Sequence, residues 1–197
     1  MRTSLRILAL AAVVAAATSC GDASRQSRSP VLLNIDLMVA SAGGGNSGGP
    51  QNASFLLSDV QTKGGVFDDF GVVTFRVSPK NPSPGITPTT LNSVSIERYH
   101  VEYIRADGHN TPGVDVPFPF DGSVAITIAA GGSGTVGFEL VRHVAKEEAP
   151  LLALVNSANI IYTIGRVTFF AHDLAGNEMS VVGEISVNFG NFADSAS

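Results

Sequence analysis

The 197-residue sequence has one cysteine, Cys20, and no tryptophan. A single cysteine has no intramolecular disulfide partner, so the fold must be held by burial of apolar side chains. The chain has 12 Lys and Arg against 17 Asp and Glu, for a formal net charge of −5. This acidic balance argues against nucleic acid as a partner, because phosphate binding needs an excess of positive side chains. The lack of tryptophan disfavours an aromatic platform for sugars.

The apolar run at residues 7–17 is too short to span a bilayer, which takes about 20 apolar residues. It follows the basic side chains Arg2 and Arg6 and ends in small residues before Cys20. A basic start, a short apolar centre and a small-residue end are typical of a secretory signal. The abrupt change to polar sequence after Cys20 argues against a transmembrane anchor or a buried helix. Residues 1–19 are therefore predicted to be an export signal.

The segment Ala17-Thr18-Ser19-Cys20 resembles the bacterial lipobox, in which small residues precede a lipid-bearing cysteine. The resemblance implies a diacylglycerol on the Cys20 sulfur, cleavage just before it and acylation of the new amino group. Two or three acyl chains make anchoring stable, where one holds a protein only marginally. Cleavage would also remove two arginines and leave a net charge of −7. By the same resemblance, Gly21 rather than Asp after the cysteine favours the outer membrane, on its periplasmic or surface face.

After the signal, the composition divides the chain into four parts. Residues 20–30 are polar and without periodicity, as expected of a tether. Residues 31–52 hold a strand at 31–40, whose odd positions are all apolar, and then a glycine-rich linker. Residues 53–190 form the main domain, and residues 191–197 are a C-terminal tail. The strand at 31–40 is expected to pair at an edge of the main domain.

Period-two alternation recurs along the main domain and predicts antiparallel strands. Residues 71–78 and 93–105 show it most clearly. A glycine-rich turn at 131–134 predicts a hairpin between residues 122–130 and 135–144. Residues 146–155 are ambiguous and compatible with one helical turn. The remaining predicted strands are 53–61, 160–173 and 179–189, so the fold class is an all-β antiparallel sandwich.

The closing segment, residues 151–189, is similar to the last two strands of bacterial immunoglobulin-like and fibronectin type III domains. Those domains carry a Leu and then a Tyr before the penultimate strand, followed by a turn of the form Asp-x-x-Gly-Asn. The counterparts here are Leu154, Tyr162 and the turn Asp173 to Asn177. The resemblance implies that Tyr162 is the corner tyrosine, with its hydroxyl bonded to backbone. It also implies that Asp173 accepts backbone N–H groups and that Gly176 adopts the left-handed conformation.

Candidate chemical groups are sparse in this sequence. His100 and His172 fall on strands expected to be neighbours and could meet near Arg98 and Glu102, although a solvated polar face explains them better. Asp and Asn side chains gather at 68–69, at 107–110 and at 173–177, and calcium takes oxygen ligands from loops of this kind. Turn formation alone explains these residues. No metal, cofactor or catalytic residue is therefore expected.

The favoured interpretation is a non-catalytic, membrane-anchored lipoprotein that binds or scaffolds a macromolecule at the cell envelope. The alternative is a carbohydrate-binding module, with or without calcium to assist the binding. It would use the aromatics Phe118 and Phe120 beside Asp115 and Asp121. A small lipoprotein enzyme ranks last, since no nucleophile or metal motif is present. Expected partners are the membrane, through lipid on Cys20, and a protein or glycan, with no nucleic acid.

Overall fold

The computed structural model of the chain describes residues 28–44, 50–81 and 88–192. The strands in this part of the chain are β1 (Val31–Ser41), β2 (Phe55–Asp59), β3 (Asp69–Pro79), β4 (Val94–Ile104), β5 (Phe120–Ile128), β6 (Ser133–Val141), β7 (Ile161–Asp173) and β8 (Glu178–Gly190). Short helical segments lie at η1 (Thr90–Asn92), α2 (His143–Lys146) and η2 (Leu151–Leu154). The predicted all-β class is confirmed.

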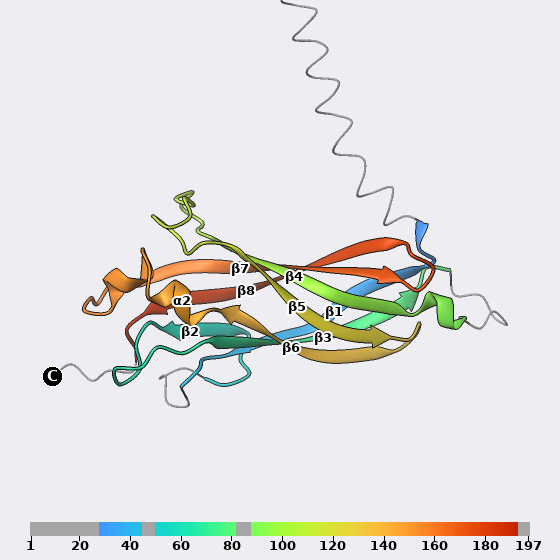
Figure 1. Cartoon of the computed structure of the whole chain (residues 1–197), viewed down its shortest axis with the longest axis horizontal. Helices are drawn as coiled ribbons and strands as arrows, with labels where there is room; N and C mark the ends of the chain where they lie inside the picture. The colour runs from blue at the N-terminus through green and yellow to red at the C-terminus, as the bar shows by residue number, and fades with distance from the viewer. Residues whose placement is uncertain (1–27, 45–49, 82–87, 193–197) are drawn as a thin grey trace, which may run out of the picture.

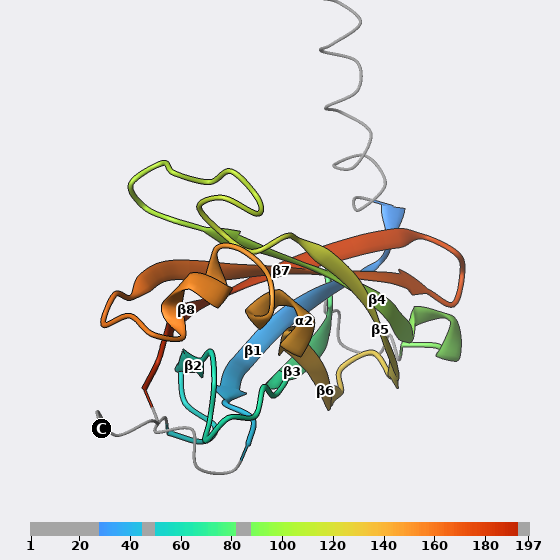
Figure 2. The ribbon, with the colours of Figure 1, turned by 60° about the vertical axis from the view of Figure 1, so that its left-hand side comes forward.

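The strands form two sheets that pack face to face (Figure 1). The smaller sheet has the order β1-β3-β6, and the larger has the order β2-β8-β7-β4-β5. Figure 2 shows β1 and β3 crossing the long strands β7 and β8 obliquely. None of the helices in the described segments is long and apolar enough to cross a membrane.

The alternation read from the sequence determines which side chains enter the core. Val73, Phe75 and Val77 of β3 are completely buried. In β4, Val94 and Ile96 are buried before a register shift between Ile96 and Arg98, and Tyr99, Val101 and Tyr103 are buried after it. At the centre, the ring of Phe169 lies 4.9 Å from that of Phe75 and 5.3 Å from that of Phe138, both edge to face. Such aromatic pairs add stability beyond their buried area. The centre of the core is thus an aromatic cluster shared by both sheets, surrounded by aliphatic side chains.

β1 pairs at the edge of the smaller sheet, as predicted, but the prediction that all its odd residues share one face is wrong. The register against β3 shifts between Ile35 and Leu37. A bulge adds one unpaired residue and reverses the facing of everything after it. Val31 is therefore buried, Leu37 is exposed, and the even-numbered Ala40 is buried instead. β1 supplies core residues and is part of the sandwich.

The predicted hairpin of residues 122–130 and 135–144 is also wrong. β5 pairs with β4 at the edge of the larger sheet, whereas β6 pairs with β3 in the smaller one. The turn has the expected glycine conformation, with Gly131 at φ +83°. However, the N–H of Gly131 bonds to the carbonyl of Val77, 2.7 Å away, and so directs the chain across to β3. The glycine turn specifies a reversal of direction, and the packing decides which sheet the next strand joins.

One pairing departs from the predicted antiparallel sandwich. β2 runs parallel to β8 over residues 55–59, whereas all other pairings among the described strands are antiparallel. The chain reaches this position because β1 ends in the smaller sheet and the following segment crosses to the larger one. The first two strands thus hold an edge of each sheet.

Candidate functional site

The outer surface of the larger sheet carries an apolar patch, defined here as Phe55, Leu57, Ile104, Tyr162 and Ile164. Phe55 and Ile164 are each 40% exposed and Tyr162 is 64% exposed, while the other two side chains are half-buried. Ile104 lies directly opposite Ile164, and Phe55 and Ile164 flank one residue of β8. Directly opposed side chains such as Ile104 and Ile164 approach within about 5 Å of one another. Ser186 and Asn188 of β8 lie between the patch residues of β7 and those of β2. Contiguous exposed apolar side chains are a feature of interaction surfaces.

Paired charges border the apolar patch on the same face. Nε of Arg166 lies 2.9 Å from Oε1 of Glu184, and its Nη1 lies 3.4 Å from Oε1 of Glu102. Further along, the guanidinium of Arg98 stacks 3.8 Å from the ring centroid of Phe170. Exposed ion pairs contribute only about 0–1 kcal/mol to stability. These charges therefore mark the boundary of the apolar patch and contribute little to the stability of the fold.

The two histidines for which the sequence allowed a meeting on this face lie apart, and the preferred interpretation is a solvated polar face. His100 lies opposite Thr168 near the middle of the β4–β7 pairing, whereas His172 lies opposite Ser95 near one end of it. His100 contacts Asp121 instead, with Nδ1 3.3 Å from Oδ1. Among the described residues there is no group of three or more His, Cys, Asp or Glu side chains that could hold a metal ion.

The aspartates that suggested calcium ligands form bonds within the protein. Asp107 accepts hydrogen bonds from the side chain of Arg105 and from the N–H of His109, and these bonds lower its pKa to about 2. Asp68 accepts the backbone N–H of His143 at 2.5 Å and contacts its ring at 2.8 Å. Each carboxylate thus fixes a loop or a helix start.

The turn Asp173 to Asn177 has the geometry that the sequence predicts. Oδ1 of Asp173 accepts the N–H groups of Ala175 at 3.1 Å and of Asn177 at 2.8 Å. Gly176 has a φ of +87°, in the left-handed region. Burial alone would raise the pKa of Asp173, but these hydrogen bonds, together with one from the Asn177 amide, lower it overall. Leu154, also part of the predicted motif, is buried in η2.

The role predicted for Tyr162 is wrong. Tyr162 occupies an outward position of β7 and belongs to the apolar patch, and its hydroxyl bonds to no other described residue. Two tyrosines of β4 have hydroxyls bonded to backbone instead: Tyr99 accepts the N–H of Glu139 at 3.1 Å, and the buried Tyr103 donates to the carbonyl of Leu140 at 2.7 Å. That bond joins the two sheets, and burial raises the pKa of Tyr103 far above its ordinary value.

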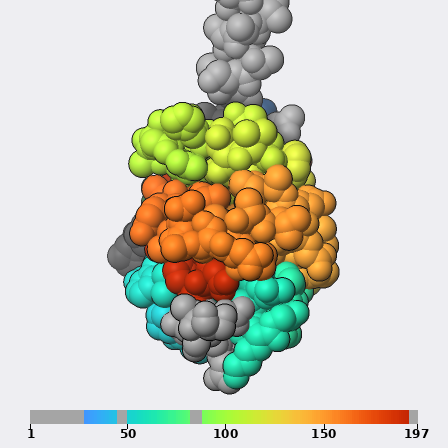
Figure 3. Space-filling view, turned by 90° about the vertical axis from the view of Figure 1, so that its left-hand side faces the viewer, coloured from blue at the N-terminus to red at the C-terminus, as the bar shows by residue number. Residues whose placement is uncertain are grey.

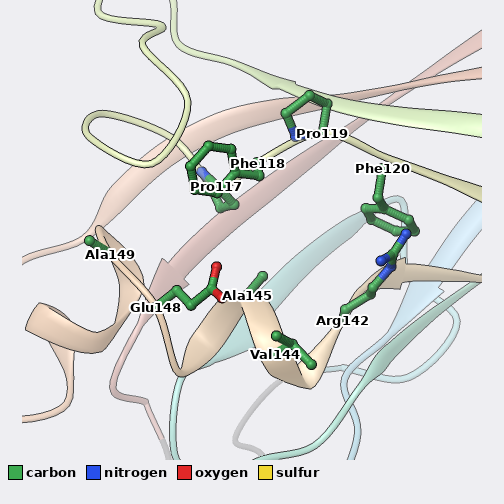
Figure 4. Close-up of a pocket in the computed structure, with 9 residues that line it drawn as sticks. All are labelled: Pro117, Phe118, Pro119, Phe120, Arg142, Val144, Ala145, Glu148 and Ala149. Atoms are coloured by element: carbon green, nitrogen blue, oxygen red, sulfur yellow. The ribbon is translucent and has the colours of Figure 1, made fainter.

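A shallow pocket of about 90 Å³ opens at the end of the sandwich where β4 finishes (Figures 3 and 4). Figure 3 shows the yellow-green loop between β4 and β5 lying beside the orange segment between β6 and β7. Residues from both line the pocket: Pro117, Phe118, Pro119, Phe120, Arg142, Val144, Ala145, Glu148 and Ala149. Sites for small ligands usually measure about 300–1,000 Å³, so this pocket fits one small apolar group.

Of the two aromatics proposed for sugar binding, only Phe118 is available, because it is 56% exposed. Phe120 is buried under Arg142, whose guanidinium lies 3.9 Å from its ring centroid. Arg142 also donates to the backbone carbonyl of Asp121 at 3.0 Å. Figure 4 shows Arg142 and Glu148 on opposite sides of the pocket. The prediction of a two-ring platform is therefore wrong.

Sequence reasoning missed the buried ion pair of Lys146 and Asp69. Nζ of Lys146 lies 2.9 Å from Oδ2 of Asp69, and both side chains are 1% exposed. Lys146 precedes two glutamates in an ambiguous segment, which is the pattern of a solvated surface, and Asp69 stood beside Asp68 in a presumed turn. No local signal distinguishes a buried lysine of this kind. Cys20 and residues 1–27 lie outside the described residues.

These features define the class of the protein as an all-β sandwich of two sheets. No family model matches the chain, and no curated protein matches it. Among solved structures, the chain is similar to one titled as the X-ray structure of Northeast Structural Genomics Consortium target SoR45. The identity is 9%, the TM-score is 0.36, and the alignment covers 82% of this chain and 86% of the other. A likeness at this level carries no argument about function.

Proposed function

We propose that this chain is a non-catalytic, lipid-anchored module of the bacterial cell envelope that binds or scaffolds another macromolecule. The observation that supports it best is the apolar patch on the outer face of the larger sheet, which is bordered on one side by paired charges. The titratable groups at the strand ends hold loops and helices together, as Asp68, Asp107 and Asp173 do. Such groups are committed to structure.

The strand order favours an immunoglobulin-like sandwich for this module. In that fold one sheet contains strands B and E, and the other contains G, F and C, to which variable-type domains add C′. With β3 as B, the described strands give β3-β6 in one sheet and β8-β7-β4-β5, or G-F-C-C′, in the other. The first strand is divided between the two sheets as β1 and β2. The turn from Asp173 to Asn177 agrees with this assignment.

The anchor in this proposal is lipid on Cys20, followed by a tether over residues 20–30, with the outer membrane as the favoured location. Cells producing the full chain or its Cys20→Ala variant would be grown with a clickable fatty acid. Label is expected on the wild-type protein and not on the variant, because Cys20 is the one cysteine. Label retained by Cys20→Ala would place the anchor elsewhere and overturn this part of the proposal.

The binding role is tested by changing the patch without touching the core. Tyr162→Ser combined with Ile164→Asp replaces two exposed apolar side chains of the patch. Leu91→Asp is the matched control, since Leu91 is also an exposed apolar residue. It lies in η1, just before the start of β4, whereas the patch lies beside the end of β4. Crosslinking in intact cells is expected to yield adducts with the wild type and the control and not with the patch variant. Equal adducts from all three would refute a role for the patch.

A second candidate is glycan binding through the end pocket, which the exposed ring of Phe118 favours. An aromatic face beside the polar groups of Arg142 and Glu148 could hold the apolar face of a sugar. A glycan array would be probed with the wild type and with Phe118→Ala, with and without calcium. Binding that is lost in Phe118→Ala would support this candidate, whereas silence of the wild type in both conditions would remove it.

A further inference from the structure

The chain has three lysines, Lys63, Lys80 and Lys146, and of these only Lys146 is buried. Its amine approaches the Asp69 carboxyl within 2.9 Å although the two residues belong to different elements, α2 and β3. Burial takes both charges out of water, and their attraction makes up for the lost hydration only where the geometry and the surrounding hydrogen bonds are good. Passing the ammonium proton to the carboxylate leaves a neutral amine against a neutral acid and removes both charges. That uncharged pair contains the two reactants of amide formation.

The remaining atoms around Asp69 are arranged about its carboxyl group. Oδ1 accepts the backbone N–H of Gly43 at 2.8 Å, and Oδ2 accepts the hydroxyl of Ser58 at 2.6 Å. Ser58 is itself completely buried. A side chain at Gly43 would come within 2.1 Å of the carbonyl oxygen of Asp68, so glycine is what allows its N–H to approach. Burial raises the pKa of Asp69, although the charge of Lys146 and the hydrogen bonds from Ser58 and Gly43 act in the opposite direction. The raised pKa favours the protonated form of the Asp69 carboxyl.

We propose that Lys146 and Asp69 join through an intramolecular amide bond between Nζ and Cγ. The neutral amine attacks Cγ of the protonated carboxyl, a C–N bond forms, and the C–O bond to the hydroxyl breaks. The nitrogen releases one proton, which leaves with that hydroxyl as water. Nothing is oxidised or reduced, and no co-reactant is needed.

The neighbouring groups suit each stage of this step. The N–H of Gly43 stabilises the negative charge that develops on Oδ1 during attack, as a fixed donor does in an oxyanion hole. The hydroxyl of Ser58, beside Oδ2, is placed to hand a proton to the departing oxygen. The fold also holds the reactants together, and well-oriented intramolecular reactions reach effective concentrations of roughly 10⁵–10⁸ M. The pair of Arg98 and Asp121 lacks these conditions, because it is exposed and because a guanidinium does not deprotonate.

The test is a peptide map of the purified full-length protein by tandem mass spectrometry. The expected product is a branched peptide that contains both Lys146 and Asp69 and weighs one water less than its two linear parts. Lys146→Arg, which keeps the charge and cannot condense, is expected to give only linear peptides. Lys63→Arg, at an exposed lysine, is the control and is expected to retain the branched product.

Wild-type protein that shows a cooperative urea transition, and yields only linear peptides after prolonged incubation, would overturn the proposal. This result does not depend on whether any variant folds. Cyclisation at Asp107-Gly108 also releases one water, so the position of the loss matters. A loss mapped to that dipeptide, with Lys146 and Asp69 in linear peptides, would equally overturn it.

Discussion

Phe169 and Phe170 are adjacent in β7 and point to opposite faces, so replacing each with alanine tests the register of the larger sheet. Phe169 is completely buried and lies 4.9 Å and 5.3 Å from the rings of Phe75 and Phe138. Removing a buried phenylalanine costs about 3–5 kcal/mol, which includes the cavity left behind. Phe170 is half-buried on the outer face under the Arg98 guanidinium. An exposed cation–π contact is worth about 0.5–1 kcal/mol, so Phe170→Ala is expected to cost about 1 kcal/mol.

Urea-induced unfolding of the full chain, followed by circular dichroism, measures both changes. Phe169→Ala is expected to lower the free energy of unfolding by at least about 2 kcal/mol more than Phe170→Ala, with little change in slope. If Phe169→Ala does not fold, Phe169→Leu provides a milder comparison. A slip of one residue in the pairing would exchange the two faces. A cost for Phe170→Ala equal to or above that for Phe169→Ala would therefore refute the assigned register.

Two further predictions concern single hydrogen-bonding groups. Tyr103→Phe removes the bond to the Leu140 carbonyl and is expected to lower the free energy of unfolding in urea by about 1–3 kcal/mol. Tyr162→Phe is expected to change it almost not at all, because the Tyr162 side chain is exposed. Equal costs would contradict the different roles given to these two tyrosines. Asp173→Ala removes acceptors for two turn N–H groups and is expected to cost about 1–3 kcal/mol at neutral pH. Folding lowers the pKa of Asp173, so its contribution to stability is complete above its unfolded pKa of about 4 and is lost as the pH falls through the folded pKa. The free energies of unfolding of the wild type and the variant should therefore converge in acid. A difference that stays constant with pH would contradict this prediction.

The parts of the fold that could be predicted from the sequence are those governed by local alternation. Val73, Phe75 and Val77 recur with period two and are buried as expected, because one face of a strand must enter the core. The turn from Asp173 to Asn177 was equally predictable, since its bonds join residues at most four apart. Local chemistry decides both features.

The errors arise where distant parts of the chain decide the outcome. The bulge after Ile35 depends on how β1 meets β3, and the pattern of β1 alone continues through it. The glycine turn at residues 131–134 fits a hairpin as well as a crossing between sheets. The exchange of Tyr162 for Tyr103 likewise depends on which strand comes to lie beneath Leu140. Each choice is made by packing between elements that are far apart in sequence.

The candidate site was less predictable than the fold. The apolar patch collects one or two residues from each of β2, β4 and β7, so no segment contains its pattern. Lys146 gave no signal, because a lysine followed by two glutamates is typical of a solvated surface. Its burial follows from α2 packing over the start of β3, where Asp69 supplies the counter-charge. Only the assembled fold brings these groups together.

The ladder between β1 and β3 has a mechanical consequence. The described chain begins at one end of the long axis with β1 and finishes at the other with β8 (Figure 1). A pull on the residues before Val31, directed along that axis, loads the bonds between Val31 and Ser41 and their partners in β3 in shear, so that they resist together. A sideways pull would peel them one at a time. The sandwich is thus oriented to withstand tension from its N-terminal side.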